Sequence, residues 1–60
     1  MKSFNSILRN IQFITSIIPN KNDVDFKNVI SYLIEDLKEV SNPNNEYQRE
    51  MIDIISTFIS

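Results

Sequence analysis

The fold is decided by residues 23–40, DVDFKNVISYLIEDLKEV. Apolar side chains recur through this stretch at steps of four and three residues: Phe26, Ile30, Leu33, Leu37 and Val40. Such spacing places them on one face of an α-helix, and Val29 and Ile34 widen that face. Asn22 or Asp23 can cap the first turn, where the charge of Asp25 suits the helix dipole. The pattern predicts a helix over about residues 24–40.

The segment before this stretch carries a second helical stripe, made of Phe4, Ile7, Ile11, Ile14 and Ile18, with Leu8 beside them. Ser3 is placed to cap it. Pro19 should end it, because the residue before a proline is disfavoured in helical geometry. We therefore expect a helix over about residues 4–17, followed by a short polar loop.

The segment after it carries a third stripe, made of Tyr47, Met51, Ile54 and Phe58, with Ile52, Ile55 and Ile59 beside it. Asn42 followed by Pro43 fits an N-cap with proline at the first helical position. The predicted helix covers about residues 44–59.

Three helices of similar length with short connections predict an all-α fold, a small up-down-up three-helix bundle forming one domain over residues 1–60. The alternative is a helical hairpin whose third segment pairs with a second copy. A 60-residue chain buries a smaller fraction of its surface on folding than a larger domain does. Small domains therefore often need additional stabilisation from disulfides, a bound metal or a second subunit. The absence of cysteine and histidine excludes disulfides and the usual zinc sites. Dimerisation, or binding to a partner protein, remains as a source of additional stability.

The composition argues against catalysis and against ligand chemistry. The sequence contains no glycine, cysteine, histidine or tryptophan, so the usual general base and the glycine-rich phosphate loops are missing. We therefore expect no enzyme activity, no catalytic residues, no cofactor and no metal site. The net charge of −2 does not suit a nucleic-acid partner, and no apolar run is long enough for a membrane span. A cytoplasmic protein is expected, and the many isoleucines and asparagines suggest an AT-rich bacterial or phage gene.

The first helix carries more apolar side chains than one core face needs. Phe13 lies almost opposite Phe4 on the helix, and Ile17 is also well away from the stripe. One interpretation is that they lie at the edge of the core or are isolated exposed residues. The other is that they belong to a second interface, with a homodimer partner or with another protein. In the second case Ile52 and Ile59 could extend the same surface.

The second helix has an acidic polar face. Glu35, Asp36 and Glu39 gather there together with Asp25, and Tyr32 lies near them. Such a face is commonly only solvated, but it could dock a basic surface, with Tyr32 as an interface anchor.

The leading functional interpretation is a small non-enzymatic protein-interaction module, a regulator or inhibitor that binds another protein through its helical surfaces. One alternative is a DNA-binding or transcription-accessory domain that uses the last helix, although its single arginine among several acids is a poor fit to phosphate. Another alternative is a structural subunit of a larger helical assembly.

Overall fold

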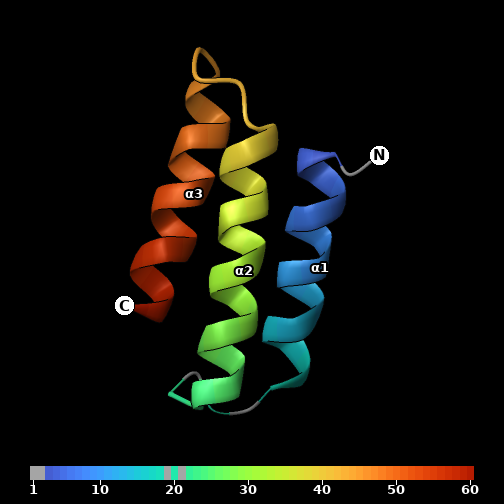
Figure 1. Cartoon of the computed structure of the whole chain (residues 1–60), viewed down its shortest axis with the longest axis vertical. Helices are drawn as coiled ribbons and strands as arrows, with labels where there is room; N and C mark the ends of the chain where they lie inside the picture. The colour runs from blue at the N-terminus through green and yellow to red at the C-terminus, as the bar shows by residue number, and fades with distance from the viewer. Residues whose placement is uncertain (1–2, 19, 21) are drawn as a thin grey trace.

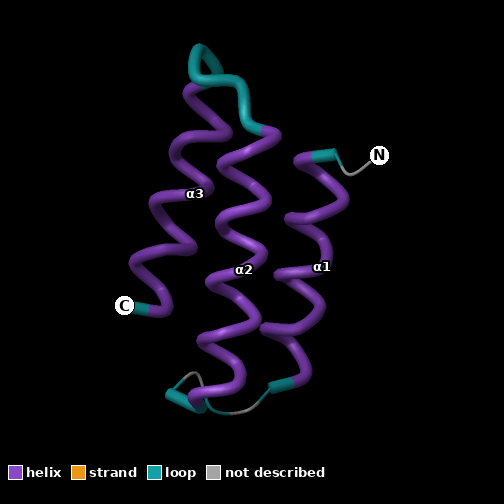
Figure 2. The backbone as a smooth tube through the Cα atoms, in the orientation of Figure 1, coloured by secondary structure: helices purple, strands orange, loops and turns teal. Residues whose placement is uncertain are grey.

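Three helices make up the fold in the computed structural model, which describes residues 3–18, 20 and 22–60. They are α1 (Phe4–Ile17), α2 (Val24–Val40) and α3 (Glu46–Ile59). Figure 2 shows helices joined by loops, with no strand among the described residues. The all-α class and the first two predicted helices are confirmed.

Side-chain caps define where α1 and α2 begin. The backbone N–H of Ser6 donates to Ser3 Oγ at 3.2 Å, and that of Phe26 donates to Asp23 Oδ1 at 3.0 Å. Each bond satisfies a donor that the first helical turn leaves unpaired. At its other end α1 stops at Ile18, whose extended backbone (φ −97°, ψ 117°) is the geometry favoured before a proline. Pro19 itself lies outside the described residues.

The cap of α2 gives a first testable prediction. Asp23→Ala should lower the free energy of unfolding by about 1 kcal/mol, because the N–H of Phe26 loses its acceptor. Asp25→Ala is the matched control, since it removes the same charge from the same turn but no capping bond. Thermal unfolding followed by circular dichroism should show a fall in Tm of about 4–8 °C for Asp23→Ala and a smaller fall for the control. Equal falls would show that charge, and not the cap, sets the effect.

Helix α3 begins later than the sequence predicts. Its N-cap is Asn45, whose Oδ1 accepts from the backbone N–H of Gln48 at 3.1 Å. Asn42, the predicted cap, instead accepts from the N–H of Asn44 at 2.9 Å and so forms a local turn. The expectation that Pro43 opens the helix is therefore wrong, because two asparagines compete for the capping role and the turn at Asn42 uses the first of them.

Helices α1 and α3 run in the same direction and α2 runs in the opposite direction between them (Figure 1). Both α1 and α3 pack against α2, whereas α1 and α3 make few contacts with each other. The Cα atoms span 33 × 23 × 16 Å, so the molecule is wider than it is thick. The predicted succession of antiparallel neighbours is confirmed, but the third side of the bundle is open.

Among residues 3–18, 20 and 22–60, only α1 and α2 contribute buried side chains to the core. It consists of Phe4, Ile7, Leu8, Ile11, Phe26, Ile30, Ile34 and Leu37. These residues belong to the apolar stripes that the sequence predicts, with Ile34 more buried than its neighbour Leu33. Helix α3 contributes only partly buried side chains to this core, which determines where the candidate site lies.

Candidate functional site

Helix α3 is the least buried helix of the protein. None of its side chains is buried, and Tyr47 and Ile54 are 55% and 58% exposed. The residues that pack against the core are instead Met51, Ile52, Ile55 and Ile59. Of the stripe expected to face the core, only Met51 packs on it. Helix α3 is thus rotated relative to the sequence expectation, and Tyr47 and Ile54 are left exposed.

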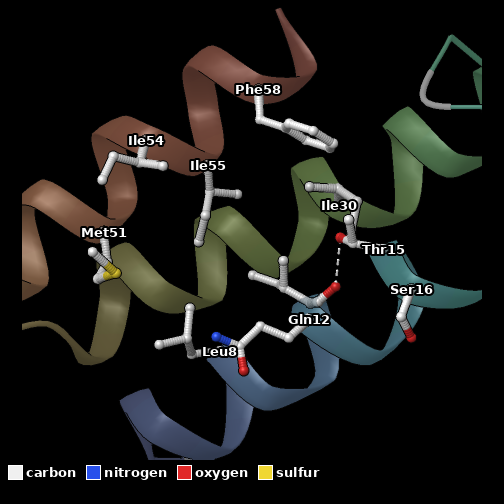
Figure 3. Close-up of a pocket in the computed structure, with 10 residues that line it drawn as sticks. Leu8, Gln12, Thr15, Ser16, Ile30, Met51, Ile54, Ile55 and Phe58 are labelled. Carbon is white, nitrogen blue, oxygen red and sulfur yellow. Dashed lines mark hydrogen bonds between the residues drawn. The ribbon is translucent and has the colours of Figure 1, made fainter.

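An open groove lies between α1 and α3, with α2 as its floor. Its volume is about 370 Å³. Helix α1 lines it with Leu8, Ile11, Gln12, Thr15 and Ser16, α2 with Ile30, and α3 with Met51, Ile54, Ile55 and Phe58. Figure 3 shows the α1 and α3 side chains on opposite walls, with Leu8 and Met51 towards one end and Thr15 and Phe58 towards the other. We call this feature the α1–α3 groove.

The groove offers apolar contact and few hydrogen-bonding groups. The hydroxyl of Thr15 donates to the carbonyl of Ile11 at 2.7 Å, a bond drawn in Figure 3, and that of Ser16 donates to the carbonyl of Phe13 at 2.7 Å. Both hydroxyl protons are therefore used within α1. The exposed amide of Gln12 is the polar group best placed to reach an occupant. An occupant would have to bind mainly by apolar contact.

The two rims of the groove carry opposite charges. Arg9 is exposed on α1 and lies three residues before Gln12, so it shares the outer side of that wall. Glu50 is exposed on α3 and lies four residues before Ile54, directly beside it on the helix surface. The apolar groove is therefore bordered by a positive rim on α1 and a negative rim on α3.

The apolar residues predicted as an interface on α1 lie away from the groove. Phe13 and Ile17 are 64% and 60% exposed. Ile17 is nine residues from Leu8, which places it about 180° around the helix from that wall of the groove. The two residues thus form a separate exposed edge of α1.

The predicted acidic surface lies on the back of α2. Tyr32 is 76% exposed and sits about 200° around the helix from Ile30, the groove floor. Glu35 and Glu39 are exposed, and Asp36 is half-buried. Glu35 Oε1 lies 3.6 Å from Lys38 Nζ, an exposed pair of the kind that adds little to stability.

The remaining predicted interface residues, Ile52 and Ile59, are half-buried and pack against the core. The structure therefore distributes the predicted interface set over three places: the edge of α1, the back of α2 and the core side of α3. Sequence reasoning missed the groove. The signal for it was present in α3, whose apolar residues cover about 160° of the helix, from Ile54 to Ile52, which is more than one contact can bury.

Neither a metal cluster nor a membrane helix is found in the part of the chain that the structure describes. Over residues 3–18, 20 and 22–60, no three histidine, cysteine or acidic side chains gather as a metal site would require. None of the helices over those residues combines the length and the apolar character needed to cross a bilayer.

Comparisons of the chain with protein-family models, with curated proteins and with solved structures find no match. The features that bear on function are the α1–α3 groove, the charges of Arg9 and Glu50 beside it, and the exposed side chains of Tyr47 and Ile54.

Proposed function

We propose that the chain is a small non-enzymatic protein-interaction module, a regulator or inhibitor that acts by binding protein through its helical surfaces. The observation that carries the proposal is the exposed apolar row of α3, which includes Tyr47 and Ile54, beside an open apolar groove. Apolar surface of this kind, rimmed by charged residues, is typical of a binding site. The proposal places the chain in the cytoplasm, a reducing compartment to which a cysteine-free sequence is suited.

The exposed apolar side chains of α3 support the same proposal, because covering them would stabilise a complex. Covering Ile54, which is 58% exposed, would contribute about 1 kcal/mol from that side chain alone.

The shape of the groove indicates the kind of occupant. Its α1 wall runs from Leu8 to Ser16, a length of about 12 Å, which corresponds to a little more than two turns of helix. An amphipathic helix laid along α1 and α3 would convert the open arrangement into a four-helix one, a recurring mode of recognition.

Photo-crosslinking in the native cell tests the proposal. A photoreactive benzoylphenylalanine at position 54 should give a discrete covalent adduct with a protein, because Ile54 lines the groove. The control carries the same group in place of Asn28, which is exposed on the opposite side of α2 from Ile30. An adduct at position 54 and none at position 28 is the expected result. No adduct at position 54, or equal adducts at both positions, would contradict the proposal.

A further inference from the structure

We infer that the partner which covers the α1–α3 groove is helix α3 of a second copy of this chain, an inference that rests on the proposed function and names its partner. Each copy presents both halves of the contact on one face: a groove, and beside it the exposed row of α3 with Tyr47 and Ile54. A surface that carries a projection and its complementary hollow side by side can pair with itself about a two-fold axis.

The two-fold axis runs along the helices, so that α3 of each copy lies parallel to α3 of the other. Tyr47 and Ile54 lie on one side of α3, and in this arrangement that side faces the same side of α3 in the partner copy. Each α3 lies over the groove of the other copy and reaches its α1. The arrangement covers the apolar row that the monomer exposes.

Charge complementarity favours this orientation. Leu8 and Met51 lie towards the same end of the groove (Figure 3). Arg9 is one residue beyond Leu8 and Glu50 is one residue before Met51, so both charges lie towards that same end of the groove. A two-fold axis along the helices keeps each charge at its own end, and it brings Arg9 of each copy to the side where Glu50 of the other lies.

The reversed orientation, with a two-fold axis across the helices, lacks this pairing. With the axis at the middle of the groove, reversal carries Glu50 of one copy to the Thr15 end of the other copy's groove, whereas Arg9 lies at the Leu8 end. Among the described residues, Arg9 makes no ion pair within its own chain.

The size of the face predicts a reversible dimer. Helix α3 has 14 residues and is about 21 Å long, and two neighbouring helices are about 20 Å wide, so each copy contributes about 400 Å² before side-chain relief. The total of about 800 Å² is below the size of a stable specific interface and corresponds to a weak, transient association. Concentrations from about 1 μM to about 1 mM should therefore span the monomer–dimer transition.

Sedimentation equilibrium with charge-reversal variants tests the inference. Arg9→Glu alone, or Glu50→Arg alone, places like charges together twice in each homodimer and should weaken association at least about tenfold. An equimolar mixture of the two variants should recover the wild-type dissociation constant within about threefold, because each contact in the mixed dimer again joins opposite charges. Both positions are exposed, and circular dichroism should show unchanged helix content.

The outcomes separate this inference from the proposed function. A wild-type chain that stays monomeric at about 1 mM, or a mixture that associates no better than the single variants, would overturn the dimer. If the adduct at position 54 in the cell then contains a different protein, the proposed function stands without the second copy. An adduct with the mass of two chains, together with recovery in the mixture, supports both.

Discussion

Replacing Phe26 by alanine should remove much or all of the stability of the protein. Phe26 is 2% exposed and lies in the core between α1 and α2. Truncation of a buried phenylalanine to alanine costs about 3–5 kcal/mol. A domain of 60 residues has a total stability of about 3–9 kcal/mol, so the loss removes much or all of it. Urea titration followed by circular dichroism should show a midpoint far below that of the wild type, or a chain without native helix content.

Phe13→Ala is the matched control for this variant. The same substitution is made inside a helix, but the Phe13 side chain is 64% exposed. Its urea midpoint should therefore stay close to that of the wild type, since exposed substitutions change stability by about 0.5 kcal/mol or less. If Phe13→Ala unfolded the chain as readily as Phe26→Ala, Phe13 would be a core residue and the described packing of α1 would be wrong.

The second large effect is expected at Ile55. Ile55→Ala should lower the free energy of unfolding by about 2 kcal/mol, because this partly buried side chain packs against the core and lines the groove beside α2. Ile54→Ala is the matched control, one residue away in the same helix and 58% exposed. Helix propensity changes equally in the two variants, so the difference between their denaturation midpoints reports packing alone.

The comparison of these two variants decides how α3 is rotated. The structure requires Ile55→Ala to be the more destabilising variant in dilute solution, where the chain is monomeric. The stripe expected from the sequence, with Ile54 in the core, requires the reverse order. A larger loss for Ile54→Ala at low protein concentration would therefore contradict the observed orientation of α3.

Much of the fold was predictable because its determinants are local. The stripes of α1 and α2, and the caps at Ser3 and Asp23, depend on residues a few positions apart. The structure confirms both caps and the centre of each stripe, whereas Val29 and Val40 of the predicted α2 face are exposed. The start of α3 was not predicted correctly, since Asn42 and Asn45 are chemically equivalent caps and only the conformation of the turn distinguishes them.

The candidate site was predictable only in part. Exposed side chains at Phe13, Ile17 and Tyr32 were expected as part of an interface, and the structure exposes all three. Whether they bind a partner stays a prediction. The groove was not anticipated, because a groove forms between helices and depends on the distance between α1 and α3, which no periodicity within one helix encodes.

Spacing along the chain is enough to predict three helices, the ends of the first two and the apolar faces of α1 and α2. Which apolar residues of α3 face α2 depends instead on how the helices pack. The apolar residues of α3 cover an arc that is too wide for its contact with α2 to bury. Part of the α2 surface is already covered by α1. The packing of Ile52, Ile55 and Ile59 therefore left Tyr47 and Ile54 exposed beside an open groove.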